Sequence, residues 1–305
     1  MSEMMTQIDP EALSGVESRF GDPKKIIEIM LNGEIELIGD IDEIYPDTPE
    51  HVNDVDIADV KSEHANRVLG VRVQKGDDTI RCVFKPAKGE NEQVKRETTV
   101  RSFYPRECAA YAISDHFKFD LVPPTVIREI NGEVGALQLF MAPEYYRNYD
   151  RMTDTEITRS SMDWKMMAAL DWILANCERH ANNMMVDVDH NEKMIAIDHG
   201  IILNPHNYFE QALRGPMVQL TQSPKNGNGK EEPISVKIPD EIISLLNDAL
   251  SSRDELTSKL SNLEGIEDLE IELMWKRVED LVNYGVFLSR YNYESVAGKS
   301  FLSEY

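Results

Sequence analysis

Four polar residues occur in an order that suits chemistry on ATP: Lys85, Glu107, Asn183 and Asp198. A lysine near the end of a strand can hold the α- and β-phosphates, and a carboxylate on a helix can fix that lysine by ion pairing. An amide and a carboxylate can hold Mg²⁺ against the phosphates. We therefore predict that Lys85 and Glu107 bind and orient the phosphates. Asn183 and Asp198 are the predicted Mg²⁺ ligands.

Both residues of the predicted phosphate pair also have ordinary interpretations. Lys85 could be a solvated strand-end lysine, and Glu107 could cap or solvate its own helix. Pro86 directly after the lysine, and a helix carboxylate further along the chain, favour the phosphate interpretation.

Alternating polar and apolar residues predict strands in the first half of the chain. The predicted elements here are a short helix at 23–31, strands at 34–38, 67–73, 79–85, 125–128 and 135–141, and a helix that begins at Pro105. Lys85 ends the third strand, and Glu107 lies in the first turn of the Pro105 helix. The pattern is typical of an antiparallel sheet with one helix.

Helical patterns dominate the second half. The predicted elements are a buried helix at 161–174, a hairpin at 184–198, and helices at 240–250, 253–263 and 266–288. Asn183 and Asp198 fall at the two ends of the hairpin. The predicted fold class is α+β with two lobes, an N-terminal antiparallel sheet lobe and a C-terminal mainly helical lobe.

We divide the chain accordingly. Residues 1–33 form an N-terminal extension, and residues 34–143 form a nucleotide-binding sheet lobe with an acidic insert at 39–60. Residues 144–305 form the helical lobe with the catalytic and metal-binding loops. The insert is either a solvated loop or an acidic lid over a cleft.

Composition limits the classes of partner. The 305 residues are 41% hydrophobic and carry a net charge of −23, so a nucleic-acid backbone is not an expected partner. No apolar run reaches the roughly 20 residues that cross a bilayer, and the first residues do not resemble a signal peptide. Three widely spaced cysteines favour a reducing compartment. We expect a cytoplasmic protein without a membrane segment.

The stretch CERHANNMM followed by IAIDHG resembles the D-R-H-x-x-N and I-D-[FH]-G motifs of the phosphatidylinositol 3-/4-kinase superfamily, above all its small bacterial members. VFKPAKGE resembles the lysine strand of that family, and RECAAYAISDHFKFDLVPPTVIR resembles its helix, turn and next strand. The likeness covers roughly residues 34–40 and 67–290 and extends more remotely to the Fam20 and HipA-type kinases. It implies a protein-kinase-like fold.

The resemblance also implies roles for two further residues. Gln138, in the segment GALQLFM that resembles the connector between lobes, would lie beside the adenine. Glu178 stands where the family has the Asp of D-R-H, so it would occupy the position of the catalytic base. Only residues 62–66 remain as a candidate phosphate loop after the first strand.

The predicted activity is ATP- and Mg²⁺-dependent phosphotransfer to a hydroxyl group. Because nothing resembles the lipid-binding domains of the large lipid kinases, the expected acceptor is a protein or small molecule. Two alternatives stay open: a pseudokinase that binds nucleotide without phosphotransfer, and an enzyme that transfers AMP. Glu178 in place of Asp predicts slow catalysis, since one extra methylene moves the carboxylate by about 1 Å.

Overall fold

The structure of the protein is a computed structural model. It describes residues 18–40, 66–98, 100–142, 145–149, 156–176, 178–190, 193–204, 216–221 and 234–299. The predicted acidic insert, beyond Gly39 and Asp40, and the candidate phosphate loop, apart from Asn66, lie outside the described residues.

Within these residues, five strands form an antiparallel sheet in the order β1-β2-β3-β5-β4. The strands are β1 (Glu34–Asp40), β2 (Leu69–Lys75), β3 (Asp78–Pro86), β4 (Thr125–Ile130) and β5 (Glu133–Leu139). The β4–β5 hairpin turns at Asn131 and Gly132, both with positive φ angles of 53° and 79°. Asn-Gly is the pair that tolerates this left-handed turn, so the predicted hairpin is confirmed.

Side chains alternate between the two faces of the sheet along each strand. Phe84, Leu137 and Val126 share one face, and they are buried in the same cluster as three apolar residues of helix α1 (Pro23–Asn32). Lys85 lies opposite Ala136 and therefore points to the other face, where Ala136 packs against α5 (Tyr104–His116). The alternation of β3 thus directs Lys85 towards α5.

The helical lobe is built around α7 (Met162–Ile173), which is buried on nearly all sides. Ser161 caps it by accepting a hydrogen bond from the Trp164 amide at 3.1 Å, a contact worth about 1 kcal/mol. The other helices described in this part of the chain are α6 (Glu156–Ser160), α8 (Pro216–Thr221), α9 (Asp240–Ser251), α10 (Arg253–Ser261), α11 (Asp268–Tyr284) and α12 (Arg290–Ala297). None of the helices that the structure describes is both long and apolar enough to cross a bilayer.

A small antiparallel sheet completes this lobe. Its strands, as far as the chain is described, are β6 (Tyr146–Asn148), β7 (Met184–Asp187) and β8 (Met194–Ala196), in that order. Strands β7 and β8 form the predicted hairpin.

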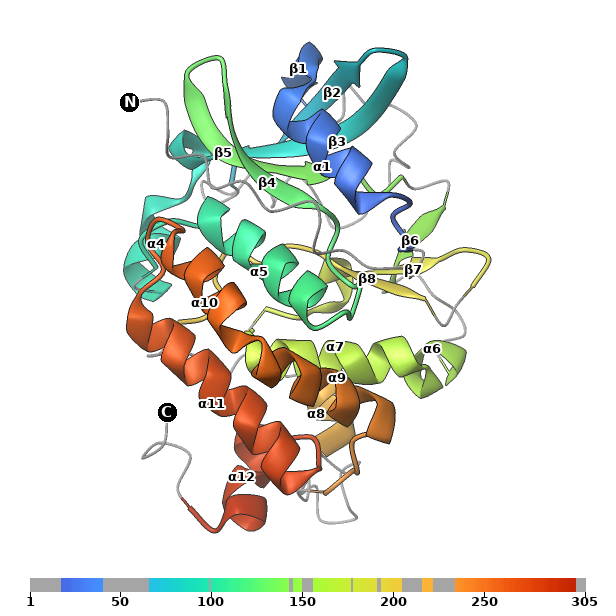
Figure 1. Ribbon diagram of the computed structural model, residues 1–305, viewed down its shortest axis with the longest axis vertical. Helices are drawn as coiled ribbons and strands as arrows, with labels where there is room; N and C mark the ends of the chain where they lie inside the picture. Colours follow the sequence, from blue (N-terminus) through green and yellow to red (C-terminus); the bar gives the residue numbers. More distant parts are fainter. Residues whose placement is uncertain are drawn as a thin grey trace.

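Helix α5 lies between the large sheet and the helices α7 and α9–α11 (Figure 1). Its Arg106 donates to the Glu270 carboxylate of α11 at 2.8 Å and to the backbone carbonyl of Ile202. Both charged side chains of this pair are almost fully buried. The sheet lobe is thereby fixed to the helical lobe through α5.

The predicted α+β, two-lobed fold is confirmed, with one difference in detail. The helix predicted at 23–31 is α1, which packs on the sheet, and helix α4 (Glu92–Thr98), which was not predicted, precedes α5. Helix α4 contains no fully buried residue, so it lacks the apolar periodicity by which a helix is recognised in sequence.

Candidate active site

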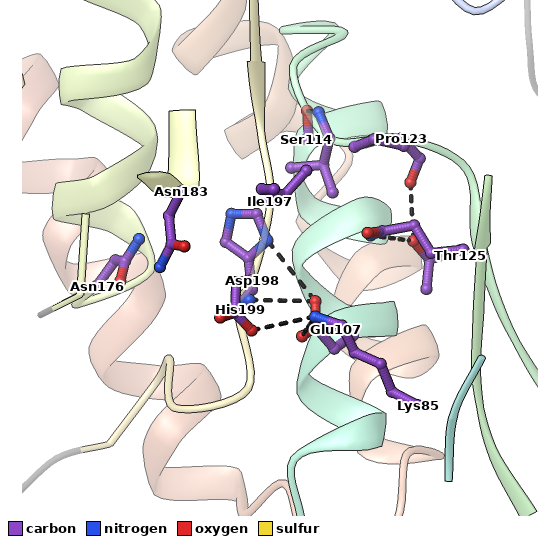
Figure 2. Close-up of polar contacts among 12 residues, drawn as sticks. Lys85, Glu107, Ser114, Pro123, Thr125, Asn176, Asn183, Ile197, Asp198 and His199 are labelled. Carbon is purple, nitrogen blue, oxygen red and sulfur yellow. Dashed lines mark hydrogen bonds and ion pairs between the residues drawn. The ribbon is translucent and has the colours of Figure 1, made fainter. Parts of the chain in front are cut away.

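Lys85 lies between two carboxylates (Figure 2). Its Nζ is 2.5 Å from Oε1 of Glu107, in the first turn of α5, and 3.1 Å from Oδ1 of Asp198, just beyond β8. The three residues come from the sheet, from α5 and from the helical lobe, and the structure brings them into direct contact.

The charges of this cluster depend on one another. Burial disfavours the Lys85 ammonium, but Asp198 and Glu107 outweigh this effect and raise the pKa of Lys85 above its usual value. The Lys85 charge lowers the pKa of Asp198 against the effect of burial. Burial raises the pKa of Glu107, and Lys85 opposes that rise. Lys85 and Asp198 therefore keep their charges over a wide pH range.

Glu107 is held through its second oxygen as well. Oε2 accepts a hydrogen bond from the backbone N–H of His199 at 3.1 Å, and the Glu107 side chain is only 2% exposed. The carboxylate is thus fixed by the chain segment that carries Asp198. A rotation of Glu107 away from Lys85 would leave a buried acceptor without its donors.

The side chain of Arg179 links the parts of the helical lobe that surround the cluster. It donates to Asp171 of α7 at 3.0 Å, to the backbone carbonyls of Asn183 and Ile197 at 2.6 and 3.0 Å, and to Nε2 of His199 at 2.7 Å. Arg179 is 1% exposed. The residues before β7 and after β8 are therefore held side by side.

The contact with Arg179 also determines which ring nitrogen of His199 carries the proton. A guanidinium has only donors, so Nε2 of His199 must accept, and the ring proton is on Nδ1. Nδ1 lies 3.9 Å from Oε2 of Glu107. Burial, with the charges of Arg179 and Lys85, holds the pKa of His199 well below its usual range, so the ring is neutral.

Asn183 is brought next to Asp198 by the main chain. The backbone N–H of Ile197 donates to the Asn183 carbonyl at 3.2 Å. The side-chain Nδ2 of Asn183 donates to the Glu178 carbonyl at 3.0 Å. This bond fixes the amide, so the oxygen Oδ1 is the atom that Asn183 can offer to a cation.

Asp198 differs from its buried neighbours because its side chain is accessible to solvent. Its side chain is 52% exposed although it contacts Lys85, and its backbone has a φ of 60°, in the left-handed region. A non-glycine residue there costs on the order of 1 kcal/mol, and such strain concentrates at functional sites. An accessible carboxylate beside a fixed amide oxygen is a donor set suited to a hard divalent cation.

Glu178 lies on the loop between α7 and β7, and its side chain is exposed. The loop backbone is ordered by Asn176, whose Oδ1 accepts from the Glu178 amide at 3.0 Å. Among the described residues we find no hydrogen bond or ion pair to the Glu178 carboxylate. Partial desolvation of the carboxylate by nearby protein atoms raises the pKa of Glu178, and the negative charge of Asp198 raises it further.

Gln138 shares the sheet face of Lys85, because it pairs with Val83. Its Nε2 donates to Oγ1 of Thr125 at 2.9 Å. Thr125 in turn donates to the Pro123 carbonyl at 2.8 Å (Figure 2). Gln138 therefore lies on the same sheet face as Lys85, with its amide nitrogen engaged by Thr125 of β4.

Three residues that organise the site were not among the predicted site residues: Asp171, Arg179 and His199. Asp171 carried a usable signal, because it is an acid near the end of a helix that is apolar on most sides. A buried carboxylate requires a paired cation, so such a position predicts a partner such as Arg179.

Comparisons with known proteins found a matching family model and relatives that align over part of their length. Residues 137–233 match the family model for phosphatidylinositol 3- and 4-kinase. A phosphatidylinositol 4-kinase gamma 4 from rice is 26% identical over 64% of this chain and 40% of its own length. Protein Rv2133c of Mycobacterium tuberculosis is 24% identical over 45% of this chain and 59% of its own length. This chain therefore aligns with only part of each curated relative.

Among solved structures, a Helicobacter pylori proinflammatory kinase, CtkA, superimposes with a TM-score of 0.38 at 12% identity. The alignment covers 72% of this chain and 88% of the other. The matched family segment contains Gln138, Glu178, Asn183 and Asp198. The predicted resemblance to the phosphatidylinositol 3-/4-kinase-related family is confirmed by the match over residues 137–233.

Proposed function

We propose that this chain is an ATP-dependent phosphotransferase that acts on a hydroxyl group of a protein or small molecule. The observation that carries the proposal is the contact of Lys85 with both Glu107 and Asp198, beside Asn183. A cation held by a helix carboxylate, next to an exposed aspartate and a fixed amide oxygen, is the arrangement that phosphoryl transfer requires.

In this proposal the lobes 34–143 and 144–305 enclose the nucleotide. Lys85 binds the α- and β-phosphates, and Glu107 orients the lysine. The β5 strand at Gln138 lies beside the adenine. Asn183 and Asp198 would hold Mg²⁺, which when bound supplies positive charge against the phosphate oxygens.

Glu178 is the proposed acceptor of the hydroxyl proton. As the acceptor oxygen bonds to the γ-phosphorus, the bond from that phosphorus to the β–γ bridging oxygen breaks and ADP leaves. The proton of the attacking hydroxyl passes to the Glu178 carboxylate. The exposed position of Glu178 allows a polar acceptor to approach it from solvent.

A lipid acceptor has less support than a soluble one. The rice relative is named as a lipid kinase, but the alignment covers 40% of that protein. The net charge of −23 disfavours approach to an anionic membrane surface.

A nucleotide-binding pseudokinase is the second candidate, and the specific observation in its favour is Glu178. A longer side chain replaces the Asp of the family motif, and its carboxylate has no partner among the described residues that would orient it.

The test is incubation with Mg²⁺ and ATP labelled at either the γ- or the α-phosphate, followed by mass measurement of the protein and of candidate acceptors. Candidates include protein substrates, small alcohols and phosphatidylinositol vesicles, and the Asp198→Ala variant serves as the inactive control. Transfer of γ-label supports the proposal. Transfer of α-label shows AMP transfer instead, and ATP binding without either transfer supports the pseudokinase.

A further inference from the structure

The chain between Lys85 and α5 is folded tightly. After β3 ends at Pro86, a short turn at Ala87–Gly89 brings the Glu90 amide to within 3.2 Å of the Ala87 carbonyl. A Cβ atom on Gly89 would lie 2.4 Å from Cβ of Arg67, so this approach to the start of β2 requires glycine. The position of Glu90 is thus fixed relative to the end of β3.

The Glu90 carboxylate lies at the beginning of α5. Its Oε1 accepts from the backbone amides of Phe103 and Tyr104, both at 2.8 Å, and the Ser102 hydroxyl lies 3.0 Å from Oε2. Oε2 is also 3.0 Å from Nζ of Lys95 in α4. The Glu90 side chain is only 5% exposed, so the contacts are shielded from water.

These bonds replace a local helix cap. The N-cap residue of α5, Phe103, provides no side-chain cap, and the first amides of a helix have no partner within it. Glu90 supplies the missing acceptor, and a negative charge is favourable at this end of a helix. The amide of Glu107 bonds to the Phe103 carbonyl at 3.2 Å, so Glu107 belongs to the turn that Glu90 holds.

We propose that Glu90 is a positioning residue that fixes the first turn of α5 to the end of β3, so that Glu107 meets Lys85. One carboxylate thereby sets the distance between the two elements that carry the ion pair. The role in catalysis rests on the proposed phosphotransferase function, but the effect on the Lys85–Glu107 contact does not.

The first experiment needs no nucleotide. Lys85 is acylated with an N-hydroxysuccinimide ester, and the extent of its labelling is followed by peptide mass spectrometry well below the melting temperature of each variant. Because the ion pair shields the amine, Glu90→Ala should raise the labelling rate of Lys85 about tenfold. Glu107→Gln, which removes the pair directly, gives the upper reference.

Three further variants separate the possible causes. Glu92 pairs with the same Lys95 at 2.9 Å but is 74% exposed, so Glu92→Ala should label like wild type. Glu90→Gln keeps an acceptor oxygen at the same reach and should also stay near wild type. Glu90→Asp keeps the charge but shortens the reach, so it should label faster even if Glu90→Ala does not fold. Wild-type labelling in folded Glu90→Ala or Glu90→Asp overturns the proposal.

The second experiment measures ATP turnover with the same variants. Glu90→Ala and Glu90→Asp should lower kcat about tenfold, because a misplaced Lys85 no longer matches the transition state. Glu90→Gln and Glu92→Ala should not. If wild type itself shows no transfer from ATP, the phosphotransferase proposal fails, while the labelling result still decides the role of Glu90.

Discussion

The two ends of the candidate site are built differently. At the end proposed to bind phosphate (the phosphate end), Lys85 contacts both Glu107 and Asp198, and Glu107 is 2% exposed. At the end proposed to receive the hydroxyl acceptor (the acceptor end), the backbone of Glu178 is anchored to Asn176 and Asn183, while the Glu178 side chain is exposed. Contacts between side chains fix the charged groups of the first end. At the second end, the described hydrogen bonds fix the backbone of Glu178 but not its carboxylate.

This difference explains where a departure from the family motif can be accommodated. One extra methylene in the side chain of Glu107 or Asp198 would displace a carboxylate that contacts Lys85. At Glu178 the same change meets no described side-chain partner, so the longer side chain can change rotamer without breaking a bond. The acceptor end is thus the part of the site with room to vary.

Removal of the accessible carboxylate at the phosphate end should have the largest effect. Asp198→Ala deletes a proposed Mg²⁺ ligand and a partner of Lys85, so turnover should fall on the order of 1000-fold or more.

For wild type, ATP with Mg²⁺ at a hundredfold excess over Kd should stabilise the fold by about 2.7 kcal/mol, seen as a higher Tm. The Mg²⁺-dependent part of this shift should vanish in the variant. The matched control is Asp189→Ala, on the exposed β7–β8 turn. An unchanged metal dependence in Asp198→Ala would contradict the ligand assignment.

The ion pair at the same end should behave as one unit. Lys85→Met and Glu107→Gln should each lower turnover by about 100-fold, and the double variant should fall little further. Their stabilities should differ, because Lys85→Met leaves the buried Glu107 carboxylate without its cation, at a cost of about 3 kcal/mol. Urea unfolding of the four proteins measures this difference. Additive losses of activity would mean that the two residues act independently.

The phosphate end was largely predictable from the sequence because local patterns placed its residues. Alternation put Lys85 near the end of a strand, and Pro105 marked the start of the helix that carries Glu107. The Asn131-Gly132 turn set the β4–β5 pairing on which the Gln138 position depends. Each of these signals acts over a few residues, and the structure reproduces the elements.

The supporting bonds were not predictable in the same way. Arg179 bonds to residues up to 20 positions away, and Arg106 reaches Glu270 across 164 positions. Such contacts depend on the packing of separate elements, which no local pattern encodes. Strand β6, three residues long, is defined only by its pairing with β7 and has no periodicity of its own to detect.

Substitutions at the acceptor end should have smaller effects than those at the phosphate end. A general base commonly contributes a factor of 100 to 10,000, but a carboxylate that no described residue orients should fall below this range, so Glu178→Ala should lower turnover about tenfold. Glu178→Asp should change the rate in whichever direction the loop backbone favours, while Kd for ATP stays constant. Turnover by wild type, Glu178→Ala and Glu178→Asp on the same acceptor gives the comparison. Equal rates in wild type and Glu178→Ala, with ATP still bound, would indicate a pseudokinase.

The smallest expected effect is on the pH dependence of turnover. It distinguishes the contributions of the two ends without a substitution at the phosphate end. A free glutamate has a pKa of about 4.3, and the pKa of Glu178 is raised by nearby protein atoms and by Asp198. A base must be ionised, so turnover should decline as the pH falls through this raised pKa. Because the pKa of Asp198 is lowered and that of Lys85 is raised, both stay charged over this pH range, and the affinity for ATP should not change with pH.

Glu107 is the competing origin of a decline in turnover at low pH, since burial raises its pKa too. Its protonation would loosen Lys85 and weaken ATP binding over the same pH range. A decline in kcat alone that disappears in Glu178→Ala assigns the titration to the acceptor end. A parallel loss of ATP affinity that persists in Glu178→Ala assigns it to Glu107, and the contrast between a fixed and an adjustable end would then be wrong.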